Sequence, residues 1–320
     1  MTGEKPIFDR VGLIGLGLIG SSMAWAMKRR NIAGHIAGYA RSEQTRARAM
    51  ELGFLDSAHE SAAACATDCD LVVLCTPLGV YKQIGEEIAP VLKSGAIVSD
   101  VGSTKVSVIN ALSPVMPEGI HLLPGHPVAG TENSGPDAGF ETLFDDRYTI
   151  LTPLSDTPTA VVDRLRAFWE ACGAMVEIMD AEHHDRVLAI TSHLPHLIAY
   201  TIVGTASDLE NQLAREQADE TDMVKTSDVI RFSAGGFRDF TRIAGSDPVM
   251  WRDVFLNNRE AVLEMLGRFS EDLVALQRAV RWSDGDKLEE WFTRTRGIRR
   301  SIVEQKQAGT FIAMETGDDD

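Results

Sequence analysis

The sequence predicts an α/β domain with a doubly wound parallel sheet, followed by an all-α domain. Short apolar runs alternate with helical segments from about residue 8 to residue 180, and long amphipathic segments without strand signals follow. Alternating strands and helices form parallel sheets that are covered on both faces, whereas amphipathic helices alone pack into bundles. We therefore expect one domain at 1–180, a second at 181–308, and a disordered acidic tail at 309–320.

Seven apolar runs are the expected strands, because short and nearly continuous apolar segments are typical of buried parallel strands. They are Val11–Gly15, Ile36–Tyr39, Asp70–Thr76, Ala96–Ser99, Ile120–Leu123, Arg147–Thr152 and Met175–Ile178. One helix is expected over Thr159–Cys172, and later helices over roughly 181–206, 208–219, 223–231, 248–280 and 285–307. The later helices are long compared with an average of about 11 residues. This favours packing across a subunit boundary, and thus a homodimer, over a self-contained bundle.

Composition excludes several classes of partner. The net charge of −16 disfavours nucleic acid and anionic membrane surfaces, so any anionic substrate needs a locally basic site. No apolar run approaches the roughly 20 residues of a membrane span, and the N-terminus lacks the apolar core of a signal peptide. The four cysteines, Cys65, Cys69, Cys75 and Cys172, show no paired metal-ligand spacing. They suit a reducing compartment, so we expect a cytoplasmic protein without a bound metal.

A glycine-rich turn follows the first expected strand. Val11–Ile14 runs into Gly15-Leu16-Gly17-Leu18-Ile19-Gly20, and a helix is expected to begin near Ser21. In this motif the first glycine permits a tight turn, the second lets pyrophosphate approach the backbone, and the third permits close packing of helix on strand. The free N–H groups of the helix then face the anion. Because strand, turn and helix occur in this order, the sequence predicts a dinucleotide site in a Rossmann-type domain rather than a glycine-rich turn without a nucleotide.

The second expected strand ends in Gly38-Tyr39-Ala40-Arg41-Ser42, without the acid that usually bonds the adenosine ribose 2′-hydroxyl. Arg41 can stack on adenine and, with Ser42, hold a 2′-phosphate, which favours NADP over NAD. The alternative is that Arg41 only stacks and NAD binds without a partner for its 2′-hydroxyl. Thr76 and Pro77 close the next parallel strand, which passes beneath the cofactor.

The most informative stretch is Gly125-His126-Pro127-Val128-Ala129-Gly130-Thr131-Glu132. We expect His126 on a loop held by the neighbouring glycines and proline, where the nicotinamide ring would end. Ser103 lies in Asp100-Val101-Gly102-Ser103-Thr104-Lys105, at the carboxyl edge of the sheet where such folds bind ligands. That place suggests a catalytic role for Ser103, and the alternative is a helix N-cap.

Two further motifs lie in the helical part. His193 and His196 are three residues apart and share a helix face, but no H-E-x-x-H pattern supports a metal pair. The alternative is a pair of structural histidines at a kink caused by Pro195.

Arg242 is expected in a glycine-broken, Asp-rich loop between helices, where it offers a bidentate fork for a carboxylate. The alternative is an ion pair with Asp239 or Asp247. His59, His183 and His184 are expected to be surface or structural residues.

These motifs make the chain resemble the prephenate/arogenate dehydrogenases, the cyclohexadienyl dehydrogenases of tyrosine biosynthesis. The resemblance spans Val11 to about Gln305, and the motifs follow the family's order. They are Gly15–Gly20, Asp100–Lys105, Gly125–Glu132, Ser192–His196 and Asp239–Arg242.

The resemblance implies a nucleotide-binding domain, a helical dimerisation domain and an active site between them. It implies that His126 is the catalytic histidine and Ser103 its hydrogen-bonding partner. It also implies that His196 and Arg242 hold the substrate, with His193 and Glu132 nearby. Gly235 and Trp251 match positions that reach the site from the partner subunit. Tyrosine, if it inhibits, is expected to compete at the active site.

Two other functions were weighed against this one. β-Hydroxyacid and 6-phosphogluconate dehydrogenases are expected to use a lysine of the helical domain, and residues 181–210 contain none. A non-catalytic NADP-binding sensor has no need for His126, Ser103 and Arg242 together, although fold alone does not decide function. The sequence leaves prephenate and arogenate unresolved, with prephenate slightly favoured.

Overall fold

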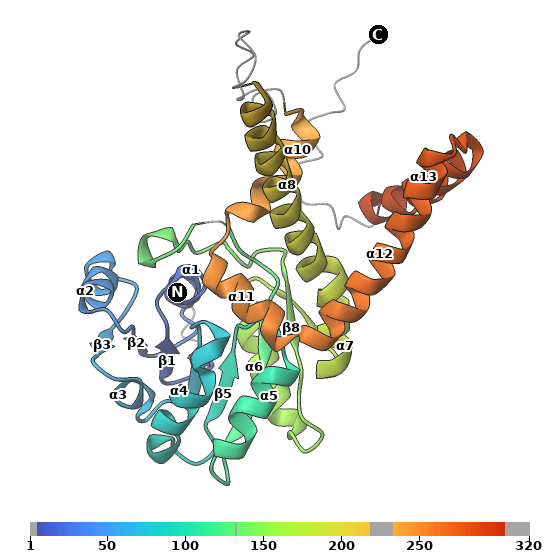
Figure 1. Cartoon of the computed structure of the whole chain (residues 1–320). Helices are drawn as coiled ribbons and strands as arrows, with labels where there is room; N and C mark the ends of the chain where they lie inside the picture. Colours follow the sequence, from blue (N-terminus) through green and yellow to red (C-terminus); the bar gives the residue numbers. More distant parts are fainter. Residues whose placement is uncertain (1–4, 132, 218–232, 305–320) are drawn as a thin grey trace, which may run out of the picture. The chain divides into compact units, whose positions relative to one another are not determined.

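The computed structural model describes residues 5–131, 133–217 and 233–304, and its elements are labelled as in Figure 1. The chain divides into two compact units, Met1–Val262 and Leu263–Asp320. The predicted domain boundary at residue 180 lies inside the first unit and stays a prediction. The predicted helix at 223–231, the acidic tail at 309–320 and Glu132 lie outside the described residues.

The first unit contains a six-stranded sheet in which all paired strands are parallel, in the order β3-β2-β1-β4-β5-β6. The strands are β1 Val11–Ile14, β2 Ile36–Tyr39, β3 Ser57–His59, β4 Leu71–Leu74, β5 Ile97–Asp100 and β6 His121–Leu122. The order runs outward from β1 in both directions, so the topological switch lies between β1 and β4. Ligands of such sheets bind outside the carboxyl ends of the strands at this point. The predicted doubly wound sheet is confirmed.

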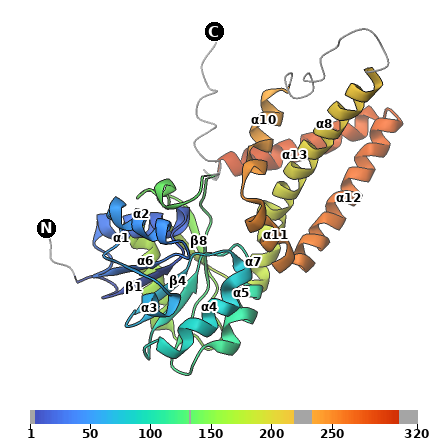
Figure 2. The ribbon, with the colours of Figure 1, turned by 60° about the vertical axis from the view of Figure 1, so that its left-hand side comes forward.

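Helices cover both faces of this sheet, which explains why its strands are apolar at nearly every position. Val11 and Leu13 face a core built with α1 and α6, whereas Ile14 faces a core built with α3, α4 and α5. Figure 2 shows α1 on one side of the strands and α4 and α5 on the other. The helices are α1 Leu18–Arg30, α2 Glu43–Leu52, α3 Ala62–Ala66, α4 Tyr81–Ile88, α5 Val106–Leu112 and α6 Thr159–Ala171.

A second, three-stranded sheet follows, with β7 Gly125–Pro127 antiparallel to β8 Tyr148–Leu151 and β8 parallel to β9 Met175–Ile178. His126 lies in β7, where it pairs with Ile150 of β8, so the expectation that it lies on a loop is wrong. The strand was missed because glycine and proline are depleted in strands and carry no strand signal. Strand pairing therefore holds the histidine more firmly than a loop would.

The helical part differs from the prediction in its boundaries. The expected helices over 181–206 and 208–219 are not separated near residue 207, because α8 Leu194–Gln217 runs through that point without a break. Two shorter elements come before it, α7 Ala181–Leu188 and a π-helical turn, η5 Ala189–His193. The expected helix over 248–280 is divided at Asn258. The glycine-broken segment before it, expected as a loop, is mostly helical (Figure 1). These elements are α10 Gly235–Thr241, the 3₁₀ turn η6 Arg242–Gly245, α11 Pro248–Asn257, α12 Arg259–Arg281 and α13 Gly285–Glu304.

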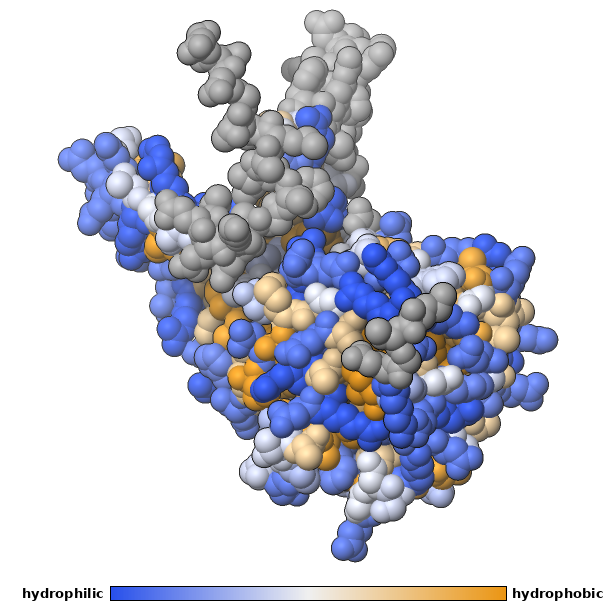
Figure 3. All heavy atoms as spheres, turned by 180° about the vertical axis from the view of Figure 1, so that it is seen from behind, coloured by the Kyte–Doolittle hydropathy of each residue, from blue (hydrophilic) through white to orange (hydrophobic). Residues whose placement is uncertain are grey.

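Within the described residues, the helical segment Ala181–Leu209 is long and apolar enough to cross a membrane by length and composition alone. The sequence expectation that no run approaches this length therefore needs correction. One such helix is weak evidence of a membrane span, because core helices of soluble proteins pass the same test. This segment carries Ser192 and His196 of the pocket described below. Hydrophilic residues cover most of the coloured surface in Figure 3, and hydrophobic residues are scattered among them.

Candidate active site

A pocket of about 570 Å³ lies in the first unit, at the carboxyl ends of the main sheet. The loops after β1, β4 and β5 form one side of it, and residues of η5, α8, η6 and α11 form the other. It brings together most of the predicted site residues, which are Gly17, Leu18, Ile19, Thr76, Pro77, Ser103, His126, His196, Arg242 and Trp251. Six others among the described residues are not in its lining, namely Gly15, Gly20, Arg41, Ser42, His193 and Gly235.

The three glycines of the first turn differ in whether the structure leaves room for a side chain at their positions. Gly15 has φ +112°, and a Cβ there would lie 2.5 Å from the carbonyl oxygen of Cys75. A Cβ on Gly20 would lie 2.1 Å from the carbonyl oxygen of Gly15, whereas one on Gly17 would meet nothing within 4 Å. The outer glycines are thus required by packing, and the middle one leaves the backbone open toward the pocket. Helix α1 begins at Leu18, one turn earlier than expected.

This end of the pocket fits a dinucleotide. The N-cap of α1, Gly17, provides no side-chain hydrogen bond, so the first N–H groups of the helix can serve an anion. The hydroxyl of Thr76 is buried and has no hydrogen-bond partner among the described residues, which leaves it for a ligand. Ser42 follows β2, but its hydroxyl caps α2 by accepting from the amide of Thr45.

His126 is buried, with 7% of its surface exposed. Its Nδ1 lies 2.9 Å from Nε2 of His184, and the two rings meet edge to face. Burial holds the pKa of His126 well below its usual range, and the nearby His184, Lys105 and His193 lower it further. The imidazole is therefore neutral near pH 7 and able to accept a proton.

His184 is a buried neighbour of His126 that the sequence analysis did not single out. It was expected to be a surface or structural residue; it is fully buried, which excludes the surface alternative, and it contacts His126. The signal was available in the helical period, because Ala181, His184, Asp185 and Leu188 are spaced to form one buried face of α7.

A buried ion pair fixes the backbone beside His126. Nζ of Lys105 lies 2.6 Å from Oδ2 of Asp100 and donates to the carbonyl oxygen of Gly125 at 2.6 Å. The other oxygen of Asp100 accepts from the amide of Gly125 at 3.1 Å. Both charged side chains are completely buried. Ser103, between them in sequence, is not the N-cap of α5, because that helix begins at Val106 with Lys105 at the cap position. Ser103 instead lines the pocket, and no hydrogen bond joins it to His126 among the described residues. The partner of the His126 ring is His184, so the structure does not show the hydrogen bond between Ser103 and His126 that the resemblance implied.

Aromatic and basic side chains form the helical wall. His196 is half-buried and stacks on Trp251 with ring centroids 3.6 Å apart, while its Nδ1–H donates to the carbonyl oxygen of Ser192 at 2.9 Å. Burial lowers the pKa of His196, and the guanidinium of Arg242 lowers it further. Trp251 thus lies in this chain's own pocket, whereas the resemblance implied a contribution from the partner subunit. Gly235 begins α10 and is exposed.

His193 lies away from the pocket lining and is completely buried. Its Nδ1 accepts from the side-chain amide of Asn258 at 3.1 Å, and that amide also donates to the backbone carbonyl of Asp185. Burial lowers the pKa of His193 to about 4. These contacts favour the structural alternative for His193, while His196 faces the pocket.

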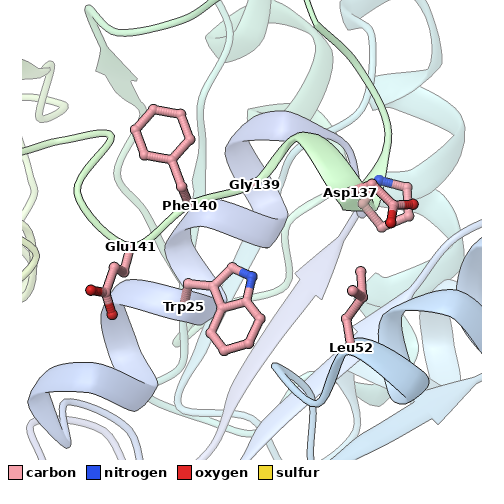
Figure 4. A pocket seen from close by; sticks show the side chains of 7 residues that line it. Trp25, Leu52, Asp137, Gly139, Phe140 and Glu141 are labelled. Carbon is pink, nitrogen blue, oxygen red and sulfur yellow. The ribbon is translucent and has the colours of Figure 1, made fainter.

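A second, shallower pocket lies between α1, the end of α2 and the segment around the 3₁₀ turn η4 Pro136–Ala138 (Figure 4). Its walls combine the apolar side chains of Trp25, Leu52 and Phe140 with the carboxylates of Asp137 and Glu141. None of the predicted site residues lines it, so the larger pocket is the candidate active site.

Comparison with known proteins identifies the family of this chain. The nucleotide-binding domain of prephenate dehydrogenase matches residues 23–178, and the dimerization domain of prephenate dehydrogenase matches residues 180–294. The chain is also 41% identical to a cyclohexadienyl dehydrogenase of Zymomonas mobilis over 296 residues, which cover 92% of this chain and 97% of that protein. The chain belongs to the prephenate dehydrogenase family. The resemblance seen in the sequence motifs is thereby confirmed.

Other members of the prephenate dehydrogenase family match over nearly the same length. A prephenate dehydrogenase of Bacillus subtilis is 32% identical, over 94% of this chain and 78% of its own. The crystal structure of prephenate dehydrogenase from A. aeolicus, in complex with hydroxyphenyl propionate and NAD+, superimposes with a TM-score of 0.82 at 30% identity, over 94% of this chain and 100% of that chain. Synechocystis arogenate dehydrogenase follows with a TM-score of 0.73 at 27% identity, over 91% of this chain and 99% of that chain. The chain is therefore an NAD(P)-dependent dehydrogenase with a dimerisation domain.

Proposed function

We propose that this chain is a cyclohexadienyl dehydrogenase that oxidatively decarboxylates prephenate, arogenate or both, with prephenate slightly favoured. One observation carries the proposal: a buried, neutral histidine, His126, lines the same pocket as the glycine turn and Arg242. The glycine turn fits a dinucleotide, the histidine fits a proton acceptor, and the guanidinium fits a carboxylate.

The reaction divides naturally between these residues. Bound NAD(P)+ supplies the hydride acceptor for C4 of the ring. His126 accepts the proton of the C4 hydroxyl as that carbon gains carbonyl character. We propose that Ser103, which lines the same pocket, hydrogen-bonds that hydroxyl rather than the ring of His126. The ring carboxylate then leaves as CO2, its bonding electrons move into the ring, and the former carbonyl oxygen becomes the phenol oxygen. His126 returns its proton to that oxygen, so the step needs no net proton.

The substrate's side-chain carboxylate needs a cation, because the chain as a whole carries a net charge of −16. We assign this task to Arg242, with His196 and Trp251 beside it on the helical wall. His196 is fixed by its bond to Ser192 and its stack on Trp251, so its Nε2 is preorganised for a hydrogen bond to the substrate.

Arg242→Gln is expected to raise the KM for prephenate by about 10-fold or more, because charge-assisted hydrogen bonds contribute about 1.5–3 kcal/mol. Turnover at saturating substrate should change much less, since the guanidinium grips the side chain rather than the reacting carbon. Steady-state kinetics at several prephenate concentrations measure both effects. A fall in kcat with unchanged KM would contradict the anchoring role.

The pH dependence of kcat/KM should reflect the lowered pKa of His126. Only the neutral imidazole accepts a proton, and lowering its pKa keeps it neutral at lower pH. The acidic limb of the profile is therefore expected below the ordinary histidine pKa of about 6.5. Rates measured from pH 4.5 to 8 with prephenate would test this, and a limb centred above 6.5 would contradict it.

We further propose that NADP is preferred, on the basis of Arg41 and the missing acid after β2. The hydroxyl of Ser42 already caps α2, so it is less available to a 2′-phosphate and Arg41 carries this preference.

We also propose a homodimer. Large apolar side chains are exposed along the helices, including Leu256, Leu263, Val280, Trp282 and Phe292. Exposed apolar area of this kind is typical of subunit interfaces. Tyrosine is expected to compete at the same pocket.

The test is a matrix of four assays that follow absorbance at 340 nm, with prephenate and arogenate each combined with NAD+ and NADP+. Reduction with either substrate supports the proposed function, and the ratios of kcat/KM give the preferences. No reduction in all four would overturn the function, and a strict preference for NAD+ would overturn the cofactor proposal alone. Adding tyrosine at low and high prephenate tests competition.

A further inference from the structure

Behind His126 a chain of hydrogen bonds leads away from the pocket. Nδ1 of His126 lies 2.9 Å from Nε2 of His184, and Nδ1 of His184 lies 2.8 Å from Oδ1 of Asp185. The carboxylate of Asp185 also accepts the backbone amides of Lys105 at 2.7 Å and Val106 at 3.0 Å. All of these groups lie in the first unit, and His184 and Asp185 are both buried.

The donor and the acceptor of each hydrogen bond follow from the end of this chain that lies farthest from the pocket, at Asp185. Burial raises the pKa of Asp185, but the two backbone N–H groups that it accepts favour its ionised form. An ionised carboxylate offers His184 only acceptor sites. His184 must therefore donate from Nδ1, which leaves its Nε2 as an acceptor. His126 must then donate from Nδ1, which leaves its Nε2 unprotonated.

We infer that His184 and Asp185 are positioning residues for the reaction. They hold His126 as the Nδ1–H tautomer, so that Nε2 is the atom that accepts the substrate proton. They also share the positive charge that His126 gains with that proton. This rests on the proposed function only for the identity of the reacting proton. The logic resembles that of a Ser-His-Asp triad, in which the carboxylate sets the histidine tautomer and stabilises the imidazolium. Here a second imidazole stands between histidine and carboxylate.

The surroundings explain why such support is needed. Burial is the main reason why a positive charge on the His126 ring is disfavoured, and the ammonium group of Lys105 adds to it. The other titratable groups that face His126, His184 and His193, are buried and neutral in the resting enzyme. Burial and Lys105 likewise lower the pKa of His184, so the short contact between His184 and Asp185 joins a neutral imidazole to a carboxylate in the resting enzyme. When His126 gains a proton, the carboxylate of Asp185 is the negative group that reaches it, through His184.

Three variants separate the two parts of this inference. His184→Phe keeps an aromatic ring, somewhat larger than imidazole, and removes the acceptor for Nδ1–H of His126. His184→Gln offers an amide oxygen to that N–H, but it breaks the link to Asp185. His59→Gln is the matched control, because His59 is a half-buried histidine on strand β3 and does not line the pocket.

The first measurement is ¹⁵N NMR of ring-labelled histidine in the resting full-length protein, with His126→Asn identifying the His126 signals. We expect a protonated Nδ1 and an unprotonated Nε2 in the wild type and in His184→Gln, and a population with protonated Nε2 in His184→Phe. This readout does not require turnover, so it tests the tautomer even if the assays with prephenate and arogenate fail. A protonated Nε2 in the wild type, or an unchanged tautomer in His184→Phe, would overturn the inference.

The second measurement is the split between kcat and KM. His184→Phe should lower kcat by between about 10-fold and 10⁴-fold, the upper figure being the loss when a triad histidine is held in the wrong tautomer. His184→Gln should lower kcat less, and both should leave KM within about 3-fold of the wild type. If both variants keep the wild-type kcat and the melting temperature, the charge-sharing role is wrong. If His184→Phe does not fold, His184→Gln carries the test alone. An unchanged kcat in His184→Gln would then contradict the charge-sharing role.

Discussion

Replacing His126 by asparagine is expected to reduce kcat by about 10²–10⁴-fold, the usual contribution of a general base. Asparagine can donate from its amide nitrogen to Nε2 of His184 much as Nδ1 does, so the hydrogen bond behind the strand can persist. What is lost is the acceptor atom on the pocket side. The measurement is single-turnover reduction of the cofactor with saturating prephenate.

Binding should survive in this variant, because the groups assigned to substrate anchoring, Arg242 and His196, are untouched. Calorimetric titration with prephenate should give a Kd within a few-fold of the wild-type value. His121→Asn is a suitable control, since His121 lies on β6 and outside the pocket. Turnover in His126→Asn equal to that of the control would remove His126 from the mechanism.

Lys105→Met is expected to reduce the free energy of unfolding by about 3–5 kcal/mol, because removing one partner of a buried ion pair leaves the other charge uncompensated. Lys105 and Asp100 are both completely buried, and Lys105 also donates to the carbonyl oxygen of Gly125. Urea unfolding followed by circular dichroism would measure the loss.

An exposed lysine provides the comparison. Lys82 pairs with Glu86 at 4.0 Å, with 71% of its side chain exposed, so Lys82→Met should change the unfolding free energy by less than about 0.5 kcal/mol. Asp100→Asn combined with Lys105→Met should recover part of the loss, because no buried charge is then left alone. Equal effects of Lys82→Met and Lys105→Met would show that the buried pair adds nothing specific.

The main sheet was predictable because its strands are buried on both faces. Runs such as Leu71–Leu74 are apolar at every position, and the glycine turn after β1 marks the switch point. The missed strands, β3 and β7, are three residues long and lack this signature. The helical boundaries were less accurate, because the end of α11 at Asn258 carries no glycine or proline to mark it.

The site residues on the pocket side were found from their motifs, but the groups behind them were not. Neither His184 nor Asp185 stands in a recognisable catalytic pattern, and their role depends on the approach of α7 to the start of α5. Such a contact joins residues 79 and 80 positions apart, and no local spacing encodes it. The buried Lys105 was also unexpected, because lysine is almost never fully buried unless it is paired.

The π-helical turn Ala189–His193 makes this helix tolerant of a change in length at one point. Such a turn holds one residue more than the α-helical path, and its wider winding absorbs that residue, so the side chains that follow keep their direction. Deleting a single residue there would restore regular winding and leave His196 on the pocket wall. Deleting a residue after this turn but before His196 would instead rotate His196 by about 100°, because each residue of an α-helix advances the side chains by that angle. An alignment gap placed within the turn therefore keeps the downstream contacts of the helix in register, including the stack of His196 on Trp251.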